Sequence, residues 1–224
     1  LNRSRELGGG GLLSVLAALN YSNSYKTYRQ MENSLFGAYD LAHDRSNYLR
    51  QSTDDQYNHD VRLGALLNLT FLPSDGQGRY EWKNIFNQIG KERFTSRAGI
   101  NAQSDNERGA EYYFSSRTTY NTQLTGKYVW QRSRMDWNAG YAYAGRRLPD
   151  RHRYTLDDAL GEGIQLTTGN EVNREYTQLD EHIGSASVNY RLKLEGGKFE
   201  PTLFGGAFAE YRSREYQTRS FIYG

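Results

Sequence analysis

The chain has 224 residues, no cysteine, and 28 basic against 26 acidic residues, which gives a net charge of +2. The lack of cysteine excludes disulfides, thiolate metal sites and a thiol nucleophile. The balanced charge, with no basic stripe, gives no indication of a nucleic-acid partner. No stretch approaches the roughly 18 apolar residues of a membrane helix, so a membrane could be crossed only by strands, which hydropathy does not detect.

Tyrosine is frequent, with 19 Tyr beside 9 Phe and 3 Trp, whereas aliphatic residues are sparse. Tyrosine favours strands and boundaries between polar and apolar surroundings. Residues 3–7 are expected to end a first strand, and the glycine run at 8–11 is expected to form its turn. Residues 12–28 then predict a long strand. One face of that strand carries Leu13, Val15, Ala17, Leu19, Tyr21 and Tyr25.

The segment 57–71 alternates most regularly. One face is mainly apolar and the other is strongly polar, which predicts a strand with one buried side. The apolar set is Tyr57, His59, Val61, Leu63, Ala65, Leu67, Leu69 and Phe71. Residues 73–78, with the sequence PSDGQG, predict a tight turn. A third strand is predicted at 79–89, with Tyr80, Trp82 and Phe86 on one face.

Four more strands are predicted in the second half. The fourth covers about 111–130, and a polar turn at 131–134 leads to the fifth, in which Trp137, Ala139, Tyr141 and Tyr143 share a face. The sixth, at about 174–192, is less regular, because Asp180 and His182 fall in phase with Tyr176, Val188 and Tyr190. A turn at 195–198 leads into a seventh strand at 199–221.

The predicted connections alternate in length. Those after residues 72, 130 and 194 span about four to six residues, whereas those after residues 28, 89 and 147 span about twenty or more. Outer-membrane barrels have short turns at one end and long loops at the other. Aromatic residues near the short turns fit the interfacial girdle of such a barrel. They are Phe71, Tyr80, Trp82, Trp130, Trp137 and Phe199.

These patterns predict an all-β fold, namely an antiparallel, up-and-down transmembrane β-barrel segment of about seven long strands. Residues 1–224 are expected to be part of a single outer-membrane barrel domain. Seven strands do not close a bacterial barrel, and an open edge is not tolerated in lipid, so further strands are expected beyond this chain. The chain starts at Leu1 without a signal segment, which is expected of a fragment or a processed piece.

Two groups of residues are candidate site residues. On the polar strand face, the residues expected to face a lumen or a plug are Asp60, Arg62, Lys83, Arg117, Gln123, Lys127 and Asp136. In the long loops, which carry binding residues on a rigid scaffold, the candidate substrate-binding residues are Tyr39, Tyr48, Arg50, Arg147, Asp150, Arg151 and Tyr154. Simple hydration is the competing interpretation for each of them.

No catalytic, metal or cofactor site is expected. Ligand spacing is missing among the four histidines, which are His43, His59, His152 and His182. The carboxylate pairs at 54–55 and 157–158 are chain neighbours in loop-like stretches, whereas a catalytic pair needs opposed positions in a cleft. The glycine run at 8–11 lacks the helix and the lysine of a phosphate-binding loop.

Five segments carry a family resemblance. They are NIFNQIG at 84–90, YNTQLTGK at 120–127, DW at 136–137, RLPD at 147–150 and EYRSREY at 210–216. They resemble barrel segments of TonB-dependent outer-membrane receptors, in particular the group with a carboxypeptidase-regulatory-like extension before the plug. The resemblance extends from residue 12 to residue 223, although none of these segments is highly specific by itself.

The resemblance implies a barrel of about 22 strands in the outer membrane of a Gram-negative bacterium. It also implies energy-coupled import of a bulky nutrient, with outer-membrane lipid, the protein's own N-terminal plug and the TonB–ExbB–ExbD complex as partners. It further allows a surface-exposed substrate-binding lipoprotein. These residues contain neither a plug nor a TonB box, so transport is an implication of the resemblance alone.

Two other function classes remain open at this point. One is a passive, porin-like outer-membrane barrel without energy coupling, which a plug domain upstream of Leu1 would exclude. The other is a secreted soluble β-protein or adhesin, which would be recovered without detergent. The transported ligand is not indicated, because receptors for glycans, peptides, siderophores and cobalamin share one barrel fold.

Overall fold

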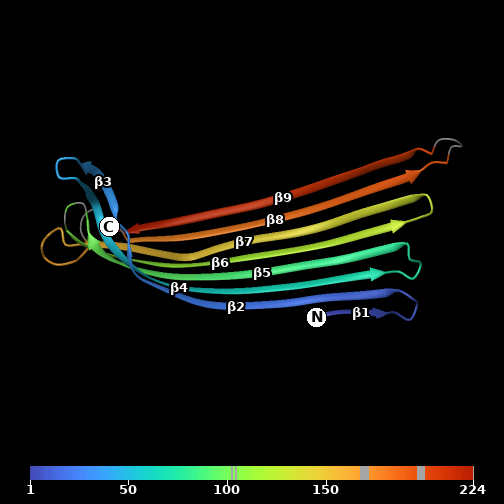
Figure 1. Ribbon diagram of the computed structural model, residues 1–224, viewed down its shortest axis with the longest axis horizontal. Helices are drawn as coiled ribbons and strands as arrows, with labels where there is room; N and C mark the ends of the chain where they lie inside the picture. The colour runs from blue at the N-terminus through green and yellow to red at the C-terminus, as the bar shows by residue number, and fades with distance from the viewer. Residues whose placement is uncertain (102, 104, 167–171, 196–199, 224) are drawn as a thin grey trace.

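The computed structural model describes residues 1–101, 103, 105–166, 172–195 and 200–223. In these residues, nine β-strands form one antiparallel sheet (Figure 1). The strands are β1 (Asn2–Glu6), β2 (Leu12–Glu32), β3 (Leu35–Asp40), β4 (Arg45–Leu72), β5 (Gly78–Ile100), β6 (Asn106–Val129), β7 (Ser133–Asp157), β8 (Val172–Lys193) and β9 (Thr202–Tyr223). The described residues include no helix that could cross a membrane.

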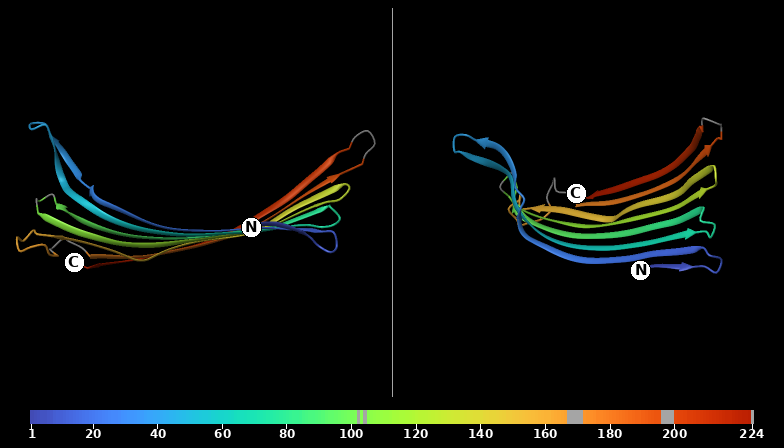
Figure 2. Two further views of the ribbon diagram at one scale, coloured as in Figure 1. Left: turned by 60° about the horizontal axis from the view of Figure 1, so that its bottom comes forward. Right: turned by 45° about the vertical axis from the view of Figure 1, so that its right-hand side comes forward.

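The sheet is a meander in which each long strand pairs with its neighbours in the chain. The order is β1-β2-β4-β5-β6-β7-β8-β9, and β3 pairs only with the beginning of β4. Seven of these strands have 21 to 28 residues, which confirms the predicted all-β, up-and-down arrangement of about seven long strands. The sheet curves but does not close, and β9 forms one open edge (Figure 2).

The strands extend further than predicted, so the prediction of three loops of about twenty residues is wrong. β5 continues to Ile100, β6 begins at Asn106, and β7 continues to Asp157. β3 and the start of β4 occupy much of the first connection as a hairpin arm. The physical reason is that polar residues such as Glu92 and Ser96 interrupt the apolar ones on one face of these extensions, so the alternation of polar and apolar residues weakens while the backbone pairing continues.

This extension changes the place of the candidate loop residues. Tyr39 lies in β3, and Tyr48 and Arg50 lie in β4. Four others that were assigned to a loop lie in β7, namely Arg147, Asp150, Arg151 and Tyr154. The predicted girdle residue Phe199 and most of the predicted turn at 195–198 lie outside the described residues.

The register defines two faces along the whole sheet, because directly paired residues of an antiparallel sheet project to the same side. The apolar face is the one that carries Leu67, Trp82, Leu124 and Trp137, and the polar face is the opposite one. A β-bulge at residues 148–151, which includes Pro149, shifts the pairing of β7 with both neighbours. Beyond the bulge, the odd-numbered residues of β7 therefore project from the polar face.

The sheet is a single layer, as the edge-on view in Figure 2 shows. Among the described residues, only two hydrophobic side chains are buried, Ala110 and Leu148, whereas Leu19 is 76% exposed and Tyr211 is 74% exposed. An ordinary soluble domain buries its apolar surface between two layers. This sheet therefore has no core of its own, and its apolar face needs a cover from outside.

Candidate functional site

A band free of charged side chains crosses the apolar face. It begins beside the short turns and includes the residues of this face within 13–21 of β2, 61–71 of β4, 80–88 of β5, 118–128 of β6, 135–145 of β7, 184–192 of β8 and 203–213 of β9. Within these fully described ranges, the polar face carries charged residues on six of the seven strands. The band ends where Glu92, Arg147, His182 and Glu215 first place titratable groups on the apolar face.

Large aromatic side chains mark the border of the band beside the short turns. Phe71 and Tyr80 stack with ring centroids 6.3 Å apart. The indole of Trp137 lies across Gly126, where a Cβ atom would come within 2.3 Å of the ring. Trp82 donates its Nε1–H to Thr122 Oγ1 at 2.9 Å. These contacts form an aromatic row beside the short turns, in which β4, β5 and β7 supply the rings and β6 supplies Gly126 and Thr122 between them.

The far border of the band, away from the short turns, is formed by tyrosines that bind polar groups. Tyr143 donates to Asp180 Oδ1 at 2.7 Å, and the hydroxyl of Tyr141 lies 2.8 Å from Nδ1 of His182. Arg147 also reaches Asp180 Oδ1, at 3.1 Å. Asp180 and His182 therefore share the apolar face with Val188 and Tyr190, as their phase indicated, and they lie where the apolar part of that face ends.

All seven residues expected on the polar strand face share the polar face in the register. They are Asp60, Arg62, Lys83, Arg117, Gln123, Lys127 and Asp136. Three of them, Lys83, Lys127 and Asp136, line a shallow hollow of about 590 Å³ near the short turns. Lys83 Nζ lies 2.7 Å from Glu81 Oε2, and Arg134 forms a two-point contact with Asp136 at 2.7 and 2.8 Å. The register therefore brings the group together along one surface rather than into one pocket.

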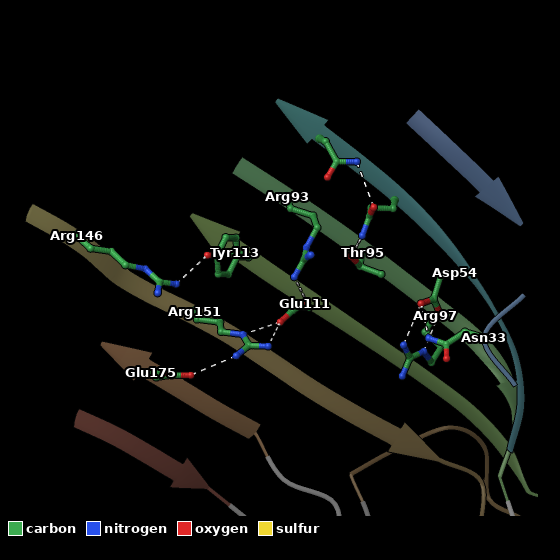
Figure 3. A network of polar contacts seen from close by, with 12 residues as sticks. Asn33, Asp54, Arg93, Thr95, Arg97, Glu111, Tyr113, Arg146, Arg151 and Glu175 are labelled. Carbon is green, nitrogen blue, oxygen red and sulfur yellow. Dashed lines mark hydrogen bonds and ion pairs between the residues drawn. The ribbon is translucent and has the colours of Figure 1, made fainter. Parts of the chain in front are cut away.

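A ladder of ion pairs crosses four strands on the polar face, beyond the far border of the band (Figure 3). Glu111 of β6 is shared by two arginines. Arg93 Nη2 of β5 lies 3.0 Å from its Oε2, and Arg151 Nε of β7 lies 2.6 Å from its Oε1. Arg151 Nη1 also lies 3.4 Å from Glu175 Oε2 of β8. Charge-assisted hydrogen bonds of this kind hold the strands in register where apolar contacts are sparse.

A second polar cluster fixes the base of the hairpin arm. Arg97 binds Asp54 through two hydrogen bonds of 2.7 and 2.9 Å, and Asn33 donates to the same carboxylate at 2.8 Å. Burial alone would raise the pKa of Asp54, but the hydrogen bonds from Arg97 and Asn33 and the charges of Arg97 and Arg50 outweigh it, so the pKa is lowered. Gly99 allows β5 to approach β4 closely beside this cluster, because a Cβ there would come within 2.4 Å of Ser52.

The candidate substrate-binding residues do not form one site. Tyr39, Tyr48 and Arg50 lie on the arm, which projects away from the rest of the sheet (Figure 2). In β7, Arg147 and Arg151 project from opposite faces because of the bulge between them. Asp150 forms an ion pair with Arg174. The fourth residue of this group in β7, Tyr154, contacts His152 with ring centroids 6.0 Å apart.

Among the ladder residues, Arg93 is missing from the sequence-based candidates because the third strand is predicted to end at residue 89. Arg151 is a candidate, but it is placed in a loop. The signal was present in the sequence, since Lys91, Arg93 and Arg97 recur at even spacing along the extension and therefore share a face. No cluster of histidine and carboxylate side chains that could hold a metal occurs in the part of the chain that the structure describes. Comparison with known proteins gives no match to a family model, a curated protein or a solved structure.

Proposed function

We propose that this chain is part of the β-barrel of a TonB-dependent outer-membrane receptor, which imports a bulky nutrient by energy-coupled transport. The proposal combines a membrane-facing role for the apolar face with the family resemblance of five sequence segments. The membrane-facing role rests on one observation, the charge-free band on one face of a single-layer sheet whose opposite face is charged.

The height of the band supports a lipid cover. In β4 it extends from Val61 to Phe71, which at about 3.3 Å per residue is roughly 33 Å along the strand. With the strand tilt of about 40° that is usual in membrane barrels, the band is about 25 Å high, which is the height of their apolar belt. The aromatic row at one border and the tyrosines at the other correspond to the two interfacial girdles.

In this arrangement the polar face lines the barrel interior, and the open edges pair with further strands, because unpaired backbone groups are not tolerated in lipid. Asp60, Arg62, Lys83, Arg117, Gln123, Lys127 and Asp136 then contact the plug or the permeation path. The arm residues Tyr39, Tyr48 and Arg50 lie beyond the membrane, on the side that meets the ligand first. Import driven by TonB comes into the proposal from the resemblance.

Two experiments on the full-length protein test the two parts of the proposal. A membrane barrel stays in the outer-membrane fraction and migrates differently in SDS gels with and without heating, and recovery in buffer without detergent would contradict the barrel. Capture of the protein by the purified periplasmic domain of TonB separates a receptor from the alternative, a passive porin-like barrel. A heat-modifiable barrel that does not bind TonB would leave only the porin-like function.

A further inference from the structure

Two arginines on the polar face are placed against each other without a counter-charge. Arg117 of β6 and Arg146 of β7 are directly paired, just beyond the far border of the band. Like charges in directly opposed positions of an antiparallel pair are destabilising. An arrangement that costs stability and persists is typical of a binding site rather than of a structural contact.

Neither arginine forms an ion pair with a carboxylate of the described residues. Arg117 forms no hydrogen bond or ion pair with them, and Arg146 makes one long hydrogen bond, from Nη2 to the Tyr113 hydroxyl at 3.4 Å. The Nε atom of Arg146 is buried and has no acceptor. Glu181, the acidic residue diagonal to Arg146 on β8, pairs with Arg212 of β9 instead. The two guanidinium groups therefore have unused donor capacity on the same surface.

The surrounding side chains add to the positive charge. Lys91 of β5 is directly opposite Asp60 of β4 and Ser115 of β6 in the register, but it forms no ion pair in the described part of the chain. Arg93 lies over the Tyr113 ring at 5.0 Å. The nearest ladder carboxylate, Glu111, is already shared by Arg93 and Arg151. The patch thus carries more cations than its carboxylates can neutralise.

The pKa of the Tyr113 hydroxyl is affected by these positive charges. Burial would raise the pKa of Tyr113, but hydrogen bonds with Ser115 and Arg146 and the charges of Arg146 and Arg117 lower it overall. A tyrosine whose ionised form is stabilised lies where a negative charge is favourable. Ile89 and Leu179 flank the two arginines in the same cross-strand row, so no charged residue lies directly beside them in that row on β5 or β8.

We infer that Arg117 and Arg146, with Lys91 beside them, form a binding site for an anionic group, a carboxylate or a phosphate, on the molecule that passes along the polar face. Two opposed guanidinium groups offer planar pairs of N–H donors, which match the oxygens of such a group and are neutralised by it. The assignment of this group to transported cargo rests on the proposed function. The anion site itself rests on the arrangement of the side chains.

The test uses the full-length protein in detergent, with inorganic phosphate and citrate as probes at constant ionic strength and titration calorimetry as the readout. At least one probe binds the unmodified protein, and the double variant Arg117→Gln/Arg146→Gln binds it at least about a hundredfold more weakly, about tenfold for each charge-assisted bond lost. Binding of phosphate alone or of citrate alone identifies which anion the site prefers. Arg134→Gln is the matched control, because Arg134 lies on the same face near the short turns, away from the two arginines, and pairs with Asp136.

Unfolding of the variants is measured as well, to separate loss of binding from loss of fold. Without the probe, the double variant should unfold at the same temperature as the unmodified protein or a higher one, because a repulsion has been removed. Failure of both probes to bind the unmodified protein, or equal binding by the double variant, would overturn the anion site. If the unmodified protein binds the anion but its mobility in SDS gels does not change on heating, the proposed import function is contradicted and the anion site is still supported.

Discussion

Leu66 and Leu67 offer a direct test of which face of the sheet meets lipid. The two residues are adjacent in the middle of the β4 band, and they project from opposite faces. Leu67 is 40% exposed on the apolar face, whereas Leu66 is half-buried on the polar face between Ala18 and Ile85. The perturbation is the same in both cases, Leu66→Arg or Leu67→Arg, so chain position and residue chemistry are matched.

Lipid and water next to the apolar face predict opposite orders for the stability that the two variants lose. In lipid, an arginine in the middle of the apolar face costs about 2–4 kcal/mol, whereas an arginine facing a polar interior costs about 1 kcal/mol or less. In water, an exposed position tolerates the change within about 0.5 kcal/mol, and the half-buried leucine is the more sensitive one. A lipid-facing band therefore makes Leu67→Arg the more damaging change, and a water-facing band makes it the milder one.

Urea titration of the full-length protein folded into lipid vesicles measures the difference, with the heat-dependent gel shift as the folded-state signal. The expected result is a loss of about 2 kcal/mol or more for Leu67→Arg relative to Leu66→Arg. If Leu66→Arg were the more damaging of the two, the apolar face would not be facing hydrocarbon, and the barrel assignment would fail.

Three further changes test the contacts that hold the strands together. Gly126→Ala should cost about 1–3 kcal/mol in a urea titration, because its Cβ would lie 2.3 Å from the Trp137 indole, whereas Gly184→Ala, with nothing within 4 Å, should be nearly neutral. Glu111→Gln should cost about 1–2 kcal/mol by releasing Arg93 and Arg151, and Glu210→Gln, whose contact with Arg212 is 3.8 Å long, serves as its control. Since the pKa of Asp54 is lowered below 3.8 in the folded state, its contribution to stability is present above about pH 4 and is lost as the pH falls through the folded-state value. Asp54→Asn should therefore flatten the dependence of stability on pH in that acidic window, and an unchanged slope would contradict the role of this carboxylate.

The band and its two faces could be predicted from the sequence because the alternation there is one-sided. Between Leu63 and Phe71, every second residue is apolar and, apart from Leu66, the residues between them are small or polar, so strand, phase and face follow from the residue types alone. The same contrast placed Trp137, Ala139 and Tyr141 on one face of β7. Where the two faces of a strand differ this strongly in polarity, the type of each residue indicates the face from which it projects.

The outer halves of the strands could not be predicted in this way. Along β5 beyond residue 89, one face carries Lys91, Arg93 and Arg97. On the other face, polar residues such as Glu92 interrupt the apolar ones, so the pattern loses contrast. What keeps this segment extended is pairing with β4 and β6, and the partners of a strand are not encoded in its own residues. The bulge near Pro149 adds a one-residue shift that decides which face Arg151 occupies, and only the register reveals it.

The arm depends on still more remote contacts. Its base is held by Asp54, Arg97 and Asn33, which are up to 64 positions apart in the chain by their numbering, and by Gly99, which allows β5 to approach Ser52. Each of these residues alone is an ordinary polar residue or glycine. Residue type alone therefore makes Tyr39 and Tyr48 candidates, but it does not indicate the bend that separates them from the β7 residues.

The distribution of paired and unpaired charges ties the fold to the proposed binding site. Beyond the band, charges such as those of the pairs Arg97–Asp54 and Arg93–Glu111 are neutralised across strands, where these pairs replace the missing apolar packing. At the border of the band, the directly paired Arg117 and Arg146 have no carboxylate partner among the described residues, although Arg117 lies only six residues from Glu111 along β6. We assign the missing negative charge to a ligand. The site lies on the polar face at the level where the band ends. In the proposed barrel, a molecule entering from the arm side would first reach the interior at this level.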